Sequence, residues 1–297
     1  MSRVLVFGSI NMDLVVETST FPRLGETLSG ASFATHAGGK GANQAVAAAR
    51  LGAKVTMLGR VGMDAFGADL IGRLTLEGVD TRWVHETVGA ATGIAAITVC
   101  NADNAIVVVA GANAQLSAAD LDAAESTFAE ADVVLAQLEV PLATVEHGAE
   151  LAARHRKPFI LNPAPAARLP QSLLERCTLI APNEYELGTA LGHFEPDWLQ
   201  DLTRLPKGVV LTKGAAGAYF IDPSGALRHQ CAFAVKPVDT TGAGDTFNGA
   251  LGAFWNLGLA EAVRRGAAAG ALAVTKRGAQ DSMPTLAELN VLLERAP

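Results

Sequence analysis

Short apolar runs rich in valine and isoleucine alternate along the chain with longer amphipathic stretches. The strand-like runs are residues 4–7, 55–58, 133–136, 159–161 and 209–212. The stretches with apolar positions at helical spacing are residues 41–51, 65–77, 118–130 and 142–155. Ser117 followed by Asp120 has the pattern of a capping box at the start of the third of these helices. The alternation predicts an α/β fold with a mostly parallel central sheet and helices on both faces.

Two segments depart from this alternation, residues 13–35 and 92–109. Both hold alternating apolar and polar positions interrupted by turn-forming residues, which is typical of antiparallel ribbons. We expect the two ribbons to pair as a small β lid beside the main sheet. The chain has no internal repeat or linker, so we expect one α/β domain over residues 1–297 with this excursion. Because isolated ribbons are marginally stable, we also expect a homodimer formed through the lid.

Composition narrows the classes of function. Hydrophobic residues make up 49% of the 297 residues and aromatic residues only 5%, so small aliphatic side chains must fill the core. The formal net charge is −7, and the lysines and arginines form no cluster. Nucleic-acid binding requires clustered basic residues that replace phosphate counterions, so this class is excluded.

The three cysteines, Cys100, Cys177 and Cys231, lie far apart and form no C-x-x-C pair. This pattern argues for a reducing compartment and against a disulfide framework or a zinc site, and we expect each cysteine to be a small buried hydrophobe. No apolar run approaches the roughly 18 residues of a membrane span. We therefore expect a soluble, cytoplasmic protein without a membrane partner.

The most informative segment is glycine-rich and reads V-D-T-T-G-A-G-D-T-F at residues 238–247, just before a helical pattern. Small residues let a ligand approach the backbone, and a helix start offers N–H groups and a positive dipole end that suit a phosphate. Asp245 would lie inside this anion site, where the helix start should favour its ionised form. Taken alone, Asp245 could equally be a helix cap. Neither a Walker phosphate loop nor a dinucleotide-binding glycine pattern is present.

Polar residues also gather after the first predicted strand. In G-S-I-N-M-D, Asn11 and Asp13 share one face of an extended chain, at the sheet edge where such folds bind ligands. In A-G-G-K-G-A-N-Q-A at residues 37–45, Lys40 and Asn43 supply donors where a helix begins. These side chains suit a hydroxyl-rich neutral ligand better than an apolar one.

Together these motifs identify a family. In chain order they are G-S-I-N-x-D, G-G-K-G-A-N-Q-A, Q-L-E-x-P, N-P-A-P, P-N-E, T-K-G-x-x-G, D-T-T-G-A-G-D-T-F-N-G and K-R-G-A-Q. From residue 4 to about residue 284 the chain resembles the ribokinase-like (PfkB) carbohydrate kinases. The resemblance implies transfer of the γ-phosphoryl group of ATP to the primary 5-hydroxyl of D-ribose, giving ribose 5-phosphate and ADP.

The resemblance also implies a role for each matching residue. Asp245 would be the catalytic base, beside an anion hole formed by the N–H groups of Gly242, Ala243 and Gly244. The sugar would be held by Asn11, Asp13, Gly39, Lys40, Gly41, Asn43, Glu139 and Asp245. The nucleotide would be bound by Asn183, Thr212, Lys213, Gly214, Ala215, Ala216, Gly217 and Gly244. An activating K⁺ would be held by Asp239, Thr241, Ala273, Lys276, Gly278 and Ser282.

Two points of the resemblance are incomplete. Mg²⁺ would be held through water by Glu184 or Glu186, and the sequence does not choose between them. Similar enzymes place a polar nucleotide contact near position 267, where this chain has Ala267.

Other functions remain open at this point. The nearest alternative is a related kinase for another sugar or a nucleoside. A non-catalytic sugar-binding regulator belongs to a different class, and Asp245 within an intact G-A-G-D argues against it. An NAD-dependent dehydrogenase is weakened by the missing glycine fingerprint.

Overall fold

The computed structural model describes residues 1–101, 103–192, 198–204, 208–222 and 224–295. Its main sheet contains β1 (Arg3–Phe7), β4 (Lys54–Gly62), β5 (Asp80–Thr87), β8 (Val133–Ala136), β9 (Phe159–Leu161), β10 (Leu179–Ile180), β11 (Gly208–Thr212), β12 (Ala218–Ile221) and β13 (Leu227–Gln230). Across the described residues the order is β13-β12-β11-β10-β9-β8-β1-β4-β5. Neighbours from β5 to β11 are parallel, and β12 and β13 are antiparallel additions at one edge. The predicted mostly parallel α/β sheet is confirmed.

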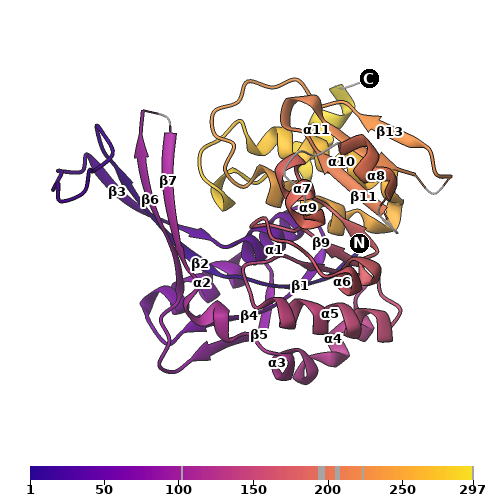
Figure 1. The fold of residues 1–297 in the computed structure, drawn as a ribbon, viewed down its shortest axis with the longest axis horizontal. Helices are drawn as coiled ribbons and strands as arrows, with labels where there is room; N and C mark the ends of the chain where they lie inside the picture. The colour runs from indigo at the N-terminus through magenta and orange to yellow at the C-terminus, as the bar shows by residue number, and fades with distance from the viewer. Residues whose placement is uncertain (102, 193–197, 205–207, 223, 296–297) are drawn as a thin grey trace.

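Helices cover both faces of this sheet (Figure 1). They are α1 (Lys40–Arg50), α2 (Ala65–Leu76), α3 (Ala118–Ala123), α4 (Glu125–Glu130), α5 (Leu142–Arg154), α6 (Gln171–Arg176), α7 (Glu184–Leu191), α8 (Trp198–Arg204), α9 (Ala243–Ala253), α10 (Leu259–Ala273) and α11 (Leu286–Arg295). Short 3₁₀ turns are η1 (Gly111–Gln115), η2 (Gly214–Ala216), η3 (Trp255–Leu257) and η4 (Gln280–Ser282). Alternate residues of β1 point to opposite faces: Val4 and Val6 pack with α1, α9 and α10, while Leu5 and Phe7 pack with α3 to α5.

The helix predicted over residues 118–130 is interrupted. Ala124, with φ −98° and ψ 13°, separates α3 from α4. The start of α3 is as predicted, because both the backbone N–H and the hydroxyl of Ser117 donate to Asp120 Oδ2, at 2.9 and 2.8 Å. The prediction of a single helix was therefore wrong only at its middle.

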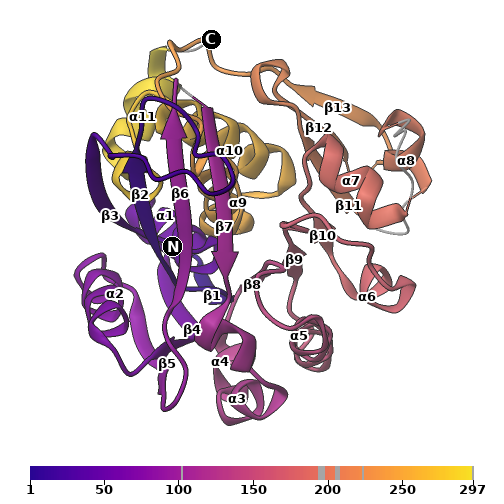
Figure 2. The same ribbon diagram turned by 60° about the vertical axis from the view of Figure 1, so that its left-hand side comes forward.

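The two predicted ribbons form a second sheet. It consists of β2 (Asn11–Glu17), β3 (Ser32–Gly38), β6 (Gly93–Cys100) and β7 (Asp103–Val109), in the order β3-β2-β6-β7. Each ribbon is antiparallel, and the parallel pair β2–β6 joins them. Figures 1 and 2 show these strands standing away from the main sheet. Ala102, in the expected turn of the second ribbon, lies outside the described residues.

Helices α1 and α9 pack unusually closely because α9 has a glycine at the crossing. A Cβ added at Gly249 would lie 2.6 Å from Ala47 Cβ and 2.7 Å from Gln44 O. Contacts this short are possible only for a residue without a side chain. The close crossing brings the first turn of α1 against the first turn of α9, and this juxtaposition builds the candidate site.

Two further expectations concern the cysteines and the membrane. Cys100 and Cys177 are buried as expected, but Cys231 is exposed, so that prediction was wrong for the third cysteine. Cys231 follows the edge strand β13, whose residues are themselves mostly exposed. None of the helices in the described ranges has the length and apolar character needed to cross a membrane.

Candidate active site

Asp245 lies in the first turn of α9, after a glycine with a left-handed backbone. Gly242 has φ 73° at the N-cap, and Asp245 itself is only 8% exposed. Two amides from the first turn of α1 bind its carboxylate: Asn43 Nδ2 donates to Oδ2 at 2.9 Å, and Gln44 Nε2 donates to Oδ1 at 3.2 Å. The carboxylate of Asp245 therefore connects α9 to α1 through two hydrogen bonds. It does not cap its own helix.

The protonation of Asp245 differs from the sequence-based expectation. Burial raises the pKa of Asp245, while the charge of Lys40 and the hydrogen bonds from Asn43 and Gln44 act against this rise without cancelling it. The expectation that the helix start would favour the ionised form was therefore wrong in its net direction. Loss of water around a buried carboxylate outweighs the helix terminus here.

Asp13 lies on β2, facing the same region from the small sheet. Burial and the nearby carboxylate of Glu139 raise the pKa of Asp13 to about 6, although His36 acts in the opposite direction. The close approach of β3 requires a glycine, because a Cβ at Gly38 would lie 2.4 Å from both carboxylate oxygens of Asp13. This explains why position 38, the first glycine of the G-G-K-G motif, must be a glycine.

Glu139 lies just beyond the end of β8 and binds the start of α1. Its Oε2 accepts the backbone N–H of Lys40 at 3.0 Å and the hydroxyl of Ser9 at 2.5 Å. The same hydroxyl accepts the N–H of Gly41 at 3.3 Å. A carboxylate at a helix N-terminus satisfies backbone donors that have no partner within the helix. Glu139 thus fixes the α1 terminus in addition to facing the site.

Lys40 brings one positive charge to this group of acids. Burial would lower the pKa of Lys40, but the carboxylates of Asp245, Glu139, Glu186 and Asp13 raise it overall. One ammonium group therefore lies among four carboxylates, which come from β2, α7, α9 and the segment after β8. The predicted sugar residues are brought together around it.

Asn11 and Gly39 complete this region. Asn11 is buried, and its Oδ1 accepts from Asn113 Nδ2 at 2.7 Å. Asn113 also accepts from Ile10 N at 2.9 Å, so it holds the segment between β1 and β2. Gly39 has φ 87°, and an added Cβ would lie 2.7 Å from Asn11 N. Sequence reasoning missed Asn113, because nothing in its own segment links it to a motif about a hundred residues earlier.

A cavity of about 520 Å³ lies on the other side of the α9 terminus. Of the predicted nucleotide-binding residues, it is lined by Thr212, Gly214, Ala215, Gly217 and Gly244. A Cβ added at Gly244 would meet nothing within 4 Å, so this position faces open space. The cavity also reaches Ala243, directly beside Asp245.

Three predicted nucleotide residues, Asn183, Lys213 and Ala216, are not among the residues that line the cavity. Asn183 is the N-cap of α7, where its Oδ1 accepts from Glu186 N at 2.8 Å. The ammonium of Lys213 pairs with Glu184 Oε1 at 2.7 Å and lies 4.3 Å from the ring centre of Trp198. In this structure the side chains of Asn183 and Lys213 are therefore engaged with α7 and α8.

Sequence reasoning missed the apolar part of the cavity wall. The additional lining residues are Ala218, Ala232, Phe233, Ala234, Val235, Pro237, Thr240, Phe247, Ala267, Gly270, Ala271 and Val274. Ala267 therefore does face the cavity, and it presents a methyl group where similar enzymes were expected to have a polar contact. A mostly apolar pocket with few polar groups suits a flat aromatic ring.

The structure separates the two candidate magnesium residues. Glu184 is paired with Lys213, whereas the pKa of Glu186 is raised by burial and is affected by the charges of Lys40 and Asp245. Of the two, Glu186 is the one that is partly buried and interacts with the charges of Lys40 and Asp245. Among the residues that the structure describes, no group of three or more His, Cys, Asp or Glu side chains could hold a metal ion alone.

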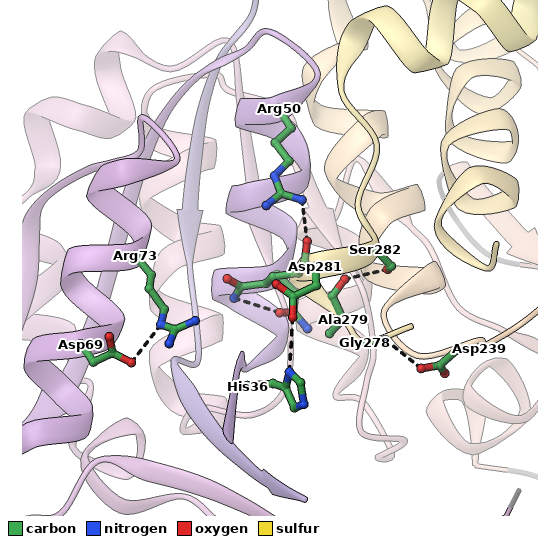
Figure 3. A network of polar contacts seen from close by, with 11 residues as sticks. His36, Arg50, Asp69, Arg73, Asp239, Gly278, Ala279, Asp281 and Ser282 are labelled. Atoms are coloured by element: carbon green, nitrogen blue, oxygen red, sulfur yellow. Dashed lines mark hydrogen bonds and ion pairs between the residues drawn. The ribbon is translucent and has the colours of Figure 1, made fainter. Parts of the chain in front are cut away.

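The predicted cation-binding residues come from two loops that touch. Asp239 Oδ1 accepts the N–H and the hydroxyl of Thr241 at 2.9 and 2.7 Å, and its Oδ2 accepts Gly278 N at 2.9 Å. Partial burial acts the other way, but these hydrogen bonds lower the pKa of Asp239, so it stays ionised. Ser282 turns its hydroxyl to Ala279 O at 2.8 Å (Figure 3).

The remaining two members, Ala273 and Lys276, lie at the end of α10. The carbonyl of Ala273 accepts Lys276 N at 3.2 Å. The ammonium of Lys276 binds Glu288 Oε1 at 2.7 Å, so its side chain points to α11. Only its backbone carbonyl could contribute to a cation site.

The second loop, which contains Gly278 and Ser282, also makes polar contacts with α1 and β3. Arg50 donates to Gln280 O and Met283 O at 2.6 and 3.0 Å. Nδ1 of His36 lies 3.3 Å from Oδ2 of Asp281 (Figure 3). Gln280 Nε2 donates to Asn43 Oδ1 at 3.1 Å. The loop therefore contacts the same asparagine that binds Asp245.

Comparison with known proteins gives a consistent result. Residues 1–286 match the family model described as pfkB family carbohydrate kinase. The chain is 40% identical to the ribokinase of Haemophilus influenzae over 301 residues, covering 98% of each chain. It is 36% identical to the deoxyribokinase of Salmonella typhi over 301 residues, again covering 98% of each. The structure of Arabidopsis thaliana ribokinase complexed with ribose and ATP matches with a TM-score of 0.91 and 31% identity, covering 99% of each chain.

Proposed function

The chain belongs to the pfkB family of carbohydrate kinases, and from this premise we propose that it transfers the γ-phosphoryl group of ATP to the primary 5-hydroxyl of D-ribose. The products are ribose 5-phosphate and ADP. The observation that carries the proposal is the position of Asp245. Its carboxylate lies between the cavity lined by Ala243 and Gly244 and the polar region around Asn43.

The polar region fits a polyol. Asp13 and Glu139 offer carboxylate oxygens that accept from vicinal hydroxyls, and Asn11, Asn43 and Lys40 offer atoms that fix orientation. Several acids with one ammonium favour a neutral ligand rich in donors over an anionic one. The apolar cavity on the other side, with Phe233 and Val235 in its wall, accepts the adenine ring.

Asp245 takes the proton of the sugar hydroxyl as the bond to phosphorus forms. Phosphoryl transfer needs mainly positioning and stabilisation of charge on the transferred oxygens. The N–H groups of Gly242, Ala243 and Gly244 at the α9 terminus supply that stabilisation as an anion hole. Ala243 N makes a long 3.3 Å bond to Thr240 O, which it would exchange for a phosphate oxygen. A pKa raised by burial makes Asp245 a stronger base than an exposed aspartate.

Glu186 is the residue we assign to Mg²⁺, through water. The assignment suits magnesium, which keeps several waters and is bound mainly by nucleotide phosphates with one or two protein carboxylates. When bound, Mg²⁺ neutralises charge on the phosphates. Glu186 is oriented for this role because its Oε2 also accepts Asn183 N at 2.9 Å.

We assign an activating K⁺ to the two touching loops. Their donor set is made of hard oxygens, with the ionised carboxylate of Asp239 and the carbonyls of Thr241, Ala273, Lys276 and Gly278, together with Ser282. An ordered cation would hold the first loop, which leads directly into Gly242. Turnover should be higher in potassium than in sodium buffer of equal ionic strength, and equal rates would remove this assignment.

The test of the proposed function is ADP formation that depends on added sugar. The purified chain is incubated with ATP and Mg²⁺, with and without K⁺, and with ribose, 2-deoxyribose, a ketohexose or a nucleoside. We expect the highest kcat/KM for ribose. Because one relative is a deoxyribokinase, 2-deoxyribose is the second candidate substrate. ADP formation without dependence on any sugar would reject the kinase assignment.

We further propose a homodimer through the small sheet. The residues of β7 are exposed throughout, with Ile106 and Val108 at 51% and Val107 at 65%, and Phe33 of β3 is 64% exposed. Large apolar side chains on an open sheet are usually covered by a partner. Sedimentation at micromolar concentration should give a dimer that Val107→Lys dissociates, and a monomeric wild type would refute the proposal.

The proposal places the chain in the cytoplasm, where ATP is the phosphoryl donor. The free cysteines, of which Cys231 is exposed, agree with a reducing compartment.

A further inference from the structure

Gln44 is buried beside Asp245, and every donor and acceptor of its side-chain amide has a hydrogen-bond partner. It is 1% exposed. Its Nε2 donates to Asp245 Oδ1 and to Asn162 Oδ1, each at 3.2 Å. Its Oε1 accepts from Gln137 Nε2 at 2.7 Å. Both amide hydrogens and the carbonyl oxygen therefore have partners.

The partners of Gln44 leave it one orientation. Asn162 Nδ2 donates to the backbone oxygen of Ala181 at 3.0 Å, and a carbonyl can only accept. This fixes Asn162 with its Oδ1 toward Gln44, so Gln44 must present its NH₂ group there. A flipped Gln44 would place two acceptors together at Asn162 and an oxygen against the Asp245 carboxylate.

The buried position of Gln137 is energetically unfavourable for one of its polar atoms. It is completely buried, and its Oε1 has no hydrogen-bond partner among the side chains and backbone that the structure describes. A Cβ added at Gly8 would lie 2.1 Å from this oxygen, so the glycine after β1 makes room for it. A buried acceptor without a partner is unfavourable, which is consistent with a site selected for the donor that Gln137 gives to Gln44.

We infer that Gln44 is a positioning residue for phosphoryl transfer, which holds Asp245 ionised and aimed at the sugar hydroxyl through an amide fixed by Asn162 and Gln137. The inference rests on the proposed function of Asp245. The charged groups that face Asp245 are Lys40 of α1, Glu139 after β8, Asp13 of β2 and Glu186 of α7. All four are unchanged when Gln44 is replaced.

The first test is the pH profile of Gln44→Met, which keeps the length of the side chain and removes the donor. The acid limb of kcat should move up by about one pH unit, because a hydrogen bond to a charged group is worth about as much as one unit of pKa. At a pH on that limb kcat should fall about tenfold, and at high pH most of it should return. An unshifted acid limb in the folded variant would overturn the inference.

The second test does not depend on turnover. Loss of the donor raises the folded-state pKa of Asp245, so Gln44→Met should lose more melting temperature at about pH 8 than at about pH 5. Asp245→Asn should abolish this pH dependence when combined with Gln44→Met. Thr144→Val is the matched control, because it removes another buried hydrogen bond, to Leu116 O at 2.7 Å, whose acceptor is a backbone carbonyl that does not titrate. Its loss should be equal at both pH values.

A loss for Gln44→Met that is equal at both pH values would also overturn the inference. If Gln44→Met yields no folded protein, Asn162→Ser replaces it in both tests and should shift both readouts the same way by a smaller amount. Unshifted readouts in Asn162→Ser would then decide against the inference. A wild type that phosphorylates no sugar would count against the proposed function, while the melting comparison would still test Gln44.

Discussion

Asn43 Nδ2 donates to Asp245 Oδ2 across 2.9 Å, and this bond joins the first turns of two helices that are 202 positions apart in the chain. It exists because Gly249 lets α9 pack directly on α1. Asn43 in turn accepts from Gln280, whose loop also contacts the segment of Asp239. One asparagine therefore links the proposed base to the sugar region and to the proposed cation loops.

Replacing Gly38 by alanine should weaken sugar binding. The new Cβ would lie 2.4 Å from the Asp13 carboxylate and must displace it. We expect the KM for ribose to rise about tenfold or more, since small misplacement of a binding group has large kinetic effects. Steady-state kinetics measures this directly.

Gly72→Ala is the control for that substitution. Gly72 is exposed on α2, and an added Cβ would meet nothing within 4 Å. Its KM should be unchanged, and its stability should rise by about 0.5–1 kcal/mol, as for alanine replacing glycine within a helix. Equal KM values for the two variants would show that Asp13 is not held as described.

Asp13→Asn should change how stability depends on pH. The pKa of Asp13 is raised from 3.8 to about 6 in the folded chain, so the folded state binds the proton more tightly than the unfolded state. The contribution of Asp13 to the stability of the wild type therefore falls as the pH rises from about 4 to about 6. Relative to the wild type, Asp13→Asn should gain melting temperature between about pH 4.5 and about pH 7.5. A constant difference would show that Asp13 titrates normally.

Ala267→Leu should impair ATP binding selectively. Ala267 lines the cavity, and three extra carbons would occupy space there. Overpacking of this kind costs about 1–3 kcal/mol, so the KM for ATP should rise about tenfold while the KM for ribose stays near its wild-type value. Ala260→Leu, at an exposed position of the same helix, should leave both values unchanged. A normal ATP KM in Ala267→Leu would place the nucleotide elsewhere.

Local pattern was sufficient to predict much of the fold. The apolar runs at Val133–Ala136 and Phe159–Leu161 became β8 and β9 without a change of boundary, because buried parallel strands need continuous apolar residues. Alternation in the chain predicted that Asn11 and Asp13 share a face of β2. The interruption at Ala124 could not be predicted, because alanine carries no signal for a helix end.

What the sequence could not predict depends on contacts between distant segments. The protonation of Asp245 is set by burial under α1, which no local motif records. Gln44 was present in a recognised motif, but its role depends on Asn162 and Gln137, each about a hundred residues away. The apolar wall around Phe233 lies in a segment without regular secondary structure, so no periodicity marked it.

The most direct test of the account is the turnover of Asp245→Asn with ribose and ATP, measured beside calorimetric binding of ribose. Asparagine keeps the shape of the side chain but cannot accept the proton. We predict that kcat falls by about 10²–10⁴-fold, the usual contribution of a general base, while the Kd for ribose stays within a few-fold of the wild type. A variant that turns over ribose at nearly the wild-type rate would contradict the assignment of Asp245 as the base.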